Sequence, residues 1–187
     1  LIFTGDNGTD KPIVTPWNGK EVVGGKGSMS DTGTRVPLIV NWPAGIKKPG
    51  RITDELVEFT DMMPTLCEIS GASLPKNHPA DGASIVPVLT NQKNIRKKDW
   101  IYIWYRDQVM VRNKKYSLLA KQNGSNARLT RYKGQFDSKE LNNQKLTKAE
   151  NTIKKEFEGI LAKMAKTRLS TVSEEGREMG LKNKSNR

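Results

Sequence analysis

The feature that most constrains the fold is a short apolar run at the start of the chain, which turn-forming residues end almost at once. Leu1-Ile2-Phe3 is continuous and β-prone, and Asp6-Asn7-Gly8 follows it closely. A strand that is buried on both faces of a parallel sheet has this pattern, because both of its faces need apolar side chains. The run therefore predicts an α/β fold in which polar side chains emerge just past Thr4, at the carboxyl end of a parallel strand.

Asp6 and Asn7 place two side-chain oxygens at that edge of the predicted sheet. Ligands of open α/β sheets gather outside the carboxyl ends of the strands. Carboxylate and amide oxygens are donors that Ca²⁺ accepts with little demand on geometry. The same triplet is also typical of a plain turn, since Asp and Asn bond their own backbone and Gly8 tolerates positive φ. The residues alone leave a cation site and a turn as alternatives.

A second loop presents one cation on a backbone with little side-chain bulk. Lys26 stands between Gly24-Gly25 and Gly27-Ser28. A lysine in this setting can reach an anion, and it can equally be the solvated tip of a flexible hairpin. The loop is not a phosphate-binding P-loop, because Gly27 follows the lysine where that motif needs Ser or Thr.

Five motifs follow one another in order between Leu1 and Leu89. They are Asp6-Asn7-Gly8, Gly25-Lys26-Gly27, Gly33-Thr34-Arg35-Val36-Pro37-Leu38, Asp61-Met62-Met63-Pro64-Thr65-Leu66 and Asp81-Gly82-Ala83-Ser84. In this order they resemble the C-terminal portion of the formylglycine-dependent, arylsulfatase-like sulfatases of the alkaline phosphatase superfamily. The resemblance continues only in outline beyond Leu89.

The resemblance implies both a fold and a reaction. The fold would be part of an α/β sulfatase-like sheet sandwiched by helices, followed by a small antiparallel sheet with a C-terminal helix. The reaction would be the hydrolysis of a sulfate ester with the help of Ca²⁺, as in a sulfuric ester hydrolase. Asp6 and Asn7 match the family's pair of metal ligands. Lys26 matches the lysine that contacts the substrate sulfate and assists catalysis.

The sequence lacks the family's nucleophile motif, C/S-x-P-x-R, whose first residue becomes formylglycine. Cys67 does not replace it, because it lies in an apolar helical run without the required Pro and Arg, where a lone cysteine is usually a small hydrophobe. We therefore expect a fragment of a longer enzyme, inactive alone, whose N-terminal portion holds the formylglycine and the other calcium ligands. Asp31 precedes Arg35 where relatives carry a glutamate, so Arg35 is expected to be a structural ion-pair partner.

Two alternative functions stay open. The first is a phosphoryl or phosphonate hydrolase or transferase of the same superfamily. Asn7 argues against it, because an amide oxygen suits Ca²⁺ and is a poor zinc ligand. The second is a non-catalytic module that binds polyanions.

Charge divides the chain into two unequal parts. Residues 1–92 hold eight Lys and Arg against ten Asp and Glu, whereas residues 93–187 hold 24 against ten, within a total net charge of +12. The basic part either attracts a polyanion or is a solvated surface. This boundary divides the chain into the C-terminal part of the catalytic α/β domain, 1–92, and a small α+β subdomain, 93–187.

Periodicity predicts the remaining elements. A helix is expected over Asp61 to Ser70, ended by Gly71, with Met62, Leu66 and Ile69 as its core face. Strands are expected as an antiparallel meander over Trp100–Tyr105, Gln108–Arg112 and Tyr116–Ala120. A capping box at Thr147 and Glu150 begins a helix with a buried stripe of Ile153, Phe157, Ile160, Leu161 and Met164. The polar segment from about Ser170 is expected to be frayed, and His78 to be a loop residue.

Composition excludes several classes of partner. No apolar run approaches the roughly eighteen residues of a membrane span, so no membrane partner is expected. Nucleic acid is not expected either, since no recognised binding motif accompanies the basic charge. The resemblance implies a sulfated small molecule or glycan as partner, together with the missing N-terminal portion. It also implies a periplasmic or extracellular location.

Overall fold

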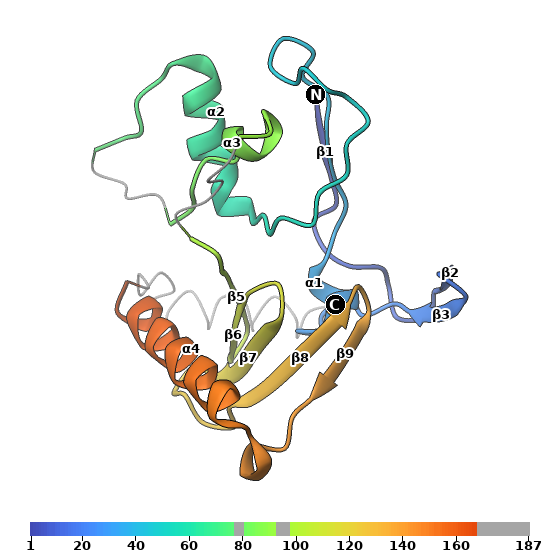
Figure 1. Ribbon diagram of the computed structural model, residues 1–187, viewed down its shortest axis with the longest axis vertical. Coiled ribbons are helices and arrows are strands. Elements are labelled where there is room, and N and C mark those ends of the chain that lie inside the picture. The colour runs from blue at the N-terminus through green and yellow to red at the C-terminus, as the bar shows by residue number, and fades with distance from the viewer. Residues whose placement is uncertain (77–80, 93–97, 168–187) are drawn as a thin grey trace, which may run out of the picture.

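The computed structural model describes residues 1–76, 81–92 and 98–167 (Figure 1). The predictions for His78 and for the segment from Ser170 lie outside these residues. The chain forms a loop-rich N-terminal part and a compact C-terminal part, in which one helix lies on a five-stranded sheet.

The first strand does not pair as predicted. β1 (Ile2–Thr4) lies antiparallel to β4 (Leu38–Val40), with Phe3 opposite Ile39. Both side chains are exposed, Phe3 by 57%. The predicted parallel, fully buried strand is therefore wrong for this chain. The apolar run does form a strand. Which strand pairs with it, and which residues bury its faces, depend on distant segments that a local sequence pattern does not contain.

A hairpin connects the first strand to the Lys26 loop. β2 (Val14–Trp17) and β3 (Lys20–Val23) are antiparallel, and Trp17 lies opposite Lys20. Asn18 and Gly19 form the turn with φ of 48° and 75°. Positive φ at both central residues gives the turn that matches the twist of two-residue hairpins, and Asn-Gly favours it.

The helix predicted over Asp61 to Ser70 is confirmed. A 3₁₀ turn, η1 (Phe59–Asp61), leads into α2 (Met62–Ser70), and Gly71 ends the helix with φ of 73°. The predicted core face is wrong, because Leu66 is 53% exposed and the buried residues are Pro64 and Thr65. The helix buries its polar Thr65 because that hydroxyl accepts a hydrogen bond from Ile85 N–H (3.0 Å), just before α3 (Val86–Leu89).

The predicted meander is confirmed and extends further than expected. β5 (Ile101–Tyr105), β6 (Gln108–Arg112), β7 (Tyr116–Lys121), β8 (Arg128–Gly134) and β9 (Asp137–Glu140) pair antiparallel in consecutive order. A short 3₁₀ turn, η2 (Asn143–Lys145), leads to the last helix.

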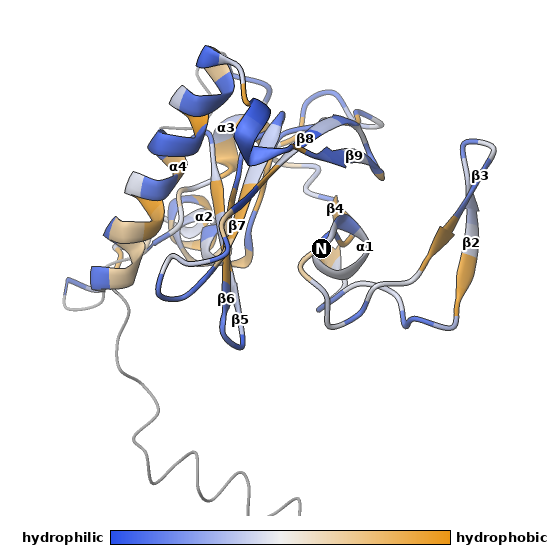
Figure 2. Ribbon diagram, turned by 90° about the horizontal axis from the view of Figure 1, so that it is seen from below, coloured by the Kyte–Doolittle hydropathy of each residue, from blue (hydrophilic) through white to orange (hydrophobic). Residues whose placement is uncertain are grey.

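Helix α4 (Lys148–Thr167) covers one face of this sheet and completes the core. Apolar residues recur along it (Figure 2). The buried cluster comprises Val109, Val111, Leu118, Ala120, Leu129, Phe157 and Leu161, with Ile153 and Ile160 packed against it. The predicted stripe is thus confirmed at these helical positions. The capping box is also present, since Thr147 N–H donates to Glu150 Oε2 (2.8 Å) and Glu150 N–H donates to Thr147 Oγ1 (3.2 Å).

Side-chain contacts fix the second part of the chain to the first. Glu58 accepts a hydrogen bond from Tyr102 N–H (3.0 Å) and pairs with Lys98. Lys114 pairs with Glu55 (2.7 Å). No helix among the described residues is both long and apolar enough to cross a bilayer.

Candidate active site

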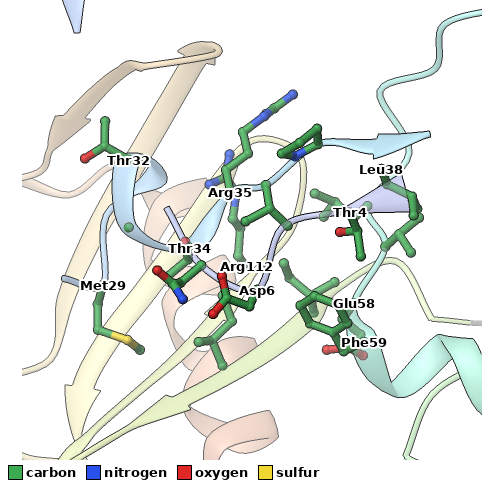
Figure 3. A pocket seen from close by; sticks show the side chains of 18 of the residues that line it. Thr4, Asp6, Met29, Thr32, Thr34, Arg35, Leu38, Glu58, Phe59 and Arg112 are labelled. Atoms are coloured by element: carbon green, nitrogen blue, oxygen red, sulfur yellow. The ribbon is translucent and has the colours of Figure 1, made fainter. Parts of the chain in front are cut away.

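A cavity of about 880 Å³ lies between the N-terminal loops and the face of the sheet that α4 leaves uncovered. Figure 3 shows that Asp6, Thr34 and Arg112, from three separate segments, surround it. Its volume is at the upper end of the range of small-ligand sites, roughly 300–1,000 Å³. The cavity is therefore large enough for a ligand with more than a single polar group.

Backbone hydrogen bonds join the Asp6 loop to the Lys26 loop. Gly8 N–H donates to Gly33 O (3.0 Å), and Lys26 N–H donates to Thr9 O (2.9 Å). A Cβ on Gly8 would lie 1.9 Å from the carbonyl oxygen of Thr32, so only glycine permits this approach. The two loops that the sequence singled out form one packed unit.

Asp6 and Asn7 both line the cavity. Asp6 is exposed and Asn7 is half-buried. Within the described ranges no group of three or more His, Cys, Asp or Glu residues is gathered for a metal ion. The two oxygens are donors of the type that Ca²⁺ takes, but this ion needs six to eight ligands. They fit part of a calcium site, and their role as ligands stays a prediction.

Lys26 is exposed at the edge of the same unit. Its neighbours Gly24, Gly27 and Ser28 line the cavity, whereas its own side chain is not part of the lining. A flexible side chain of four methylenes at this edge is free to turn toward the cavity or away from it. The structure thus joins the Lys26 loop to the loop of Asp6 and Asn7 by a backbone hydrogen bond, and the contact of Lys26 with substrate stays a prediction.

The expected ion pair of this segment is made by different residues. Arg35 is exposed and has no carboxylate partner within the described parts of the chain, so its predicted structural role is wrong. Asp31, at the start of α1 (Asp31–Thr34), instead forms a buried ion pair with Arg112 of β6. The Arg112 guanidinium also lies over the Tyr132 ring, 3.8 Å from its centroid. Burial raises the pKa of the Tyr132 hydroxyl.

Comparison with known proteins decides the family. The family described as "N-sulphoglucosamine sulphohydrolase, C-terminal" matches residues 23–169. The chain belongs to the sulfatase family, in its C-terminal portion. This sulfatase chain is 35% identical to human arylsulfatase A over 122 residues, which cover 62% of the chain and 24% of that protein. It is 34% identical to a sulfatase of Formosa agariphila over 129 residues, or 67% of the chain and 23% of that protein.

The fold agrees with this assignment. The solved structure of a 2-O GAG sulfatase matches 80% of the sulfatase chain and 33% of its own length, with a TM-score of 0.52 and 21% identity. This confirms the predicted fold, an α/β sulfatase part followed by a small antiparallel sheet and helix. The chain spans between 15% and 23% of the length of the first three curated relatives that it matches.

Sequence reasoning missed three aromatic residues of the sulfatase cavity. Trp17 and Tyr105, which end β2 and β5, and Phe136, in the turn between β8 and β9, line it from three different hairpins. The Asn18-Gly19 dipeptide was a signal for the first hairpin. Nothing local to the other two turns indicates that they face the Asp6 loop.

Proposed function

We propose that this chain is the C-terminal part of a longer sulfatase and supplies one side of a calcium-dependent site for sulfate-ester hydrolysis. In this proposal Asp6 and Asn7 are two of the calcium ligands, and Lys26 contacts the sulfate group. The formylglycine nucleophile and the other calcium ligands come from the N-terminal portion of the longer protein. The 187-residue chain alone is inactive.

The observation that carries the proposal is the hydrogen-bonded unit of the two loops. Thr9, three residues after Asp6, accepts a hydrogen bond at its carbonyl oxygen from Lys26 N–H. The carbonyl oxygen of Gly33 accepts one from Gly8 N–H. These bonds hold together the loop whose Asp6 and Asn7 line the cavity and the loop that carries Lys26, whose neighbours Gly24 and Gly27 line the same cavity. The geometry supports a site for an anionic group that is bound by a cation and a lysine together.

The chemistry of such a site follows from charge. A sulfate ester is an anion, and negative charge moves onto the leaving oxygen as the S–O bond breaks. A bound Ca²⁺ supplies Lewis-acid stabilisation of the sulfate oxygens. The Lys26 ammonium group neutralises part of the same charge and stabilises it most where it develops in the transition state. Asp6 and Asn7 orient the ion by their two oxygens, and the products are an alcohol and sulfate.

The proposal also assigns the two parts of the chain. Residues 1–92 belong to the catalytic α/β domain and residues 93–187 to a small subdomain, of which Ile101–Tyr105, Arg112, Gln135 and Phe136 line the cavity. Partners are sulfated small molecules or glycans, since relatives include an "Ulvan-active sulfatase" and a "Steryl-sulfatase". A periplasmic or extracellular location is part of the proposal.

Replacing Lys26 in the longer protein tests the proposal. Lys26→Ala is expected to lower kcat for 4-nitrophenyl sulfate by about 10² to 10³, as the loss of one charge-stabilising donor does. Lys20→Ala is the matched control, because Lys20 is an exposed lysine beside the Asn18-Gly19 turn, at the opposite end of β3 from the Lys26 loop. Near-normal turnover by Lys26→Ala would contradict the proposed contact of Lys26 with the sulfate group.

A further inference from the structure

The β2–β3 hairpin stands apart from the core and contributes residues to the lining of the cavity. It projects from the molecule in both views (Figures 1 and 2). The residues of β2 are exposed, yet Thr15, Trp17 and Val22 line the cavity. Trp17 is 40% exposed although it contacts another ring. A partly exposed indole in the cavity lining can present apolar ring surface and an N–H to a ligand.

Phe136 contacts Trp17 and lines the same cavity. It lies in the turn between β8 and β9, and its ring centroid is 5.8 Å from that of Trp17, edge to face at 90°. Its φ is 56°, a region in which a bulky L residue is rare. Strained residues of this kind persist at ligand-contacting positions. The turn therefore keeps an aromatic ring where glycine would be the relaxed choice.

The two rings form an aromatic rim, which we define as Trp17 and Phe136. They line the same cavity as Asp6 and Asn7. An edge-to-face pair covers only one ring face, and Trp17, which is exposed, and Phe136, which is half-buried, both keep accessible ring surface. Such a surface packs against the flat side of a six-membered ring, whether an aryl group or a pyranose, by apolar contact and C–H interaction. It offers nothing comparable to a bare sulfate ion.

We propose that Trp17 and Phe136 are specificity-determining residues that hold the ring of the alcohol part of a sulfate ester. This inference rests on the proposed function, because it takes the sulfate group to lie near Asp6, Asn7 and Lys26. The rim binds the ring and takes no part in S–O cleavage. It selects ring-bearing esters over sulfate itself.

Calorimetric binding to the longer protein, with its nucleophile residue replaced so that no ester is hydrolysed, tests the rim with three probes: 4-nitrophenyl sulfate, glucosamine 6-sulfate and inorganic sulfate. Trp17→Ala and Phe136→Gly are each expected to raise Kd about tenfold for at least one ring ester, the value of a lost ring contact. The Kd of inorganic sulfate should change by less than about twofold. The ester whose Kd rises shows whether the rim binds an aryl ring or a sugar ring.

Two controls keep the test specific. Trp17→Phe retains a ring and should restore most of the binding. Glu21→Ala alters the same hairpin outside the cavity lining and should change no Kd. Phe136→Gly relieves the positive φ, so its melting temperature should not fall.

An equal rise in Kd for all three probes, or an unchanged Kd for both ring esters, would contradict the assignment of Trp17 and Phe136 as ring-binding residues. A fall in melting temperature that accounts for the loss of binding would also overturn it. The proposed function is tested separately, and near-normal turnover by the Lys26→Ala variant would contradict it. Binding is measured without turnover, so the rim is decided even where no sulfate is released.

Discussion

Arg112 and Asp31 form a buried ion pair that joins the sheet of the C-terminal part to the loop unit carrying Asp6 and Lys26. Their side chains are only 8% and 7% exposed, and a second contact joins Arg112 Nη2 to Asp31 Oδ2 at 3.5 Å. Asp31 lies two residues before Gly33, whose carbonyl holds Gly8. The position of the candidate site thus depends on a charge supplied from β6.

The first prediction is that Arg112→Met in the longer protein lowers the free energy of unfolding by about 3–5 kcal/mol. Removing one partner leaves the Asp31 carboxylate buried without its counter-charge. Arg128→Met is the matched control, because Arg128 pairs with Glu140 at the surface, where such pairs contribute about 0–1 kcal/mol. Urea unfolding of both variants measures the difference, and equal losses would contradict a special role for the buried pair.

This pair also shows where prediction from sequence ends. Asp31 and Arg112 are 81 positions apart, and nothing in either neighbourhood indicates the other. The meander and α4 were predictable because alternation and the capping box are local signals. The partner of β1 and the buried face of α2 were not, since distant segments decide them. Asp6, Asn7 and Lys26 were predicted through ordered motifs, whereas the backbone hydrogen bonds between their two loops needed the structure.

The second prediction concerns Asp61, which has no exposed surface. Its carboxylate accepts from Glu58 N–H (2.9 Å) and from Ala83 N–H (2.8 Å), and thereby joins η1 to the Asp81-Gly82-Ala83 segment. Asp61→Asn turns an amide NH₂ toward one of these donors. We expect a loss of about 1–3 kcal/mol in the free energy of unfolding, the cost of one unsatisfied buried group.

Asp10→Asn is the control for Asp61, because Asp10 is exposed and, among the described residues, its side chain accepts only from the adjacent Lys11 N–H. It should change the free energy of unfolding by less than about 0.5 kcal/mol. If Asp61→Asn matches this control in chemical denaturation, the "D-x-x-P-T-L" motif is not a structural device here.

The third prediction is a pH dependence at the start of α4. The backbone N–H of Thr147, then its hydroxyl, hold the pKa of Glu150 below its ordinary value of 4.5. A lowered folded pKa stabilises the protein above pH 4.5, and the effect is lost as pH falls through the folded pKa. Wild type should therefore exceed Glu150→Gln in melting temperature at pH 6, with the gap closing in acid. A gap that is constant with pH would contradict this.

The fourth prediction follows from the exposure of Arg35. Since this side chain has no carboxylate partner in the parts of the chain that the structure describes, Arg35→Ala should change the free energy of unfolding by no more than about 0.5 kcal/mol. Thermal unfolding of this variant beside Arg112→Met measures the contrast. A loss of several kcal/mol on removing Arg35 would show that it has a buried partner in the longer protein.

The most direct test of the account is the calcium dependence of sulfate-ester hydrolysis by the longer protein and its Asp6→Ala variant. Asp6→Ala removes one charged ligand, and ligand charge sets Ca²⁺ affinity, so the calcium concentration for half-maximal turnover should rise by about tenfold or more. Asp10→Ala, an exposed carboxylate on the same loop, should leave it unchanged. Equal calcium dependence in wild type and Asp6→Ala would contradict the assignment of the metal site and with it the proposed function.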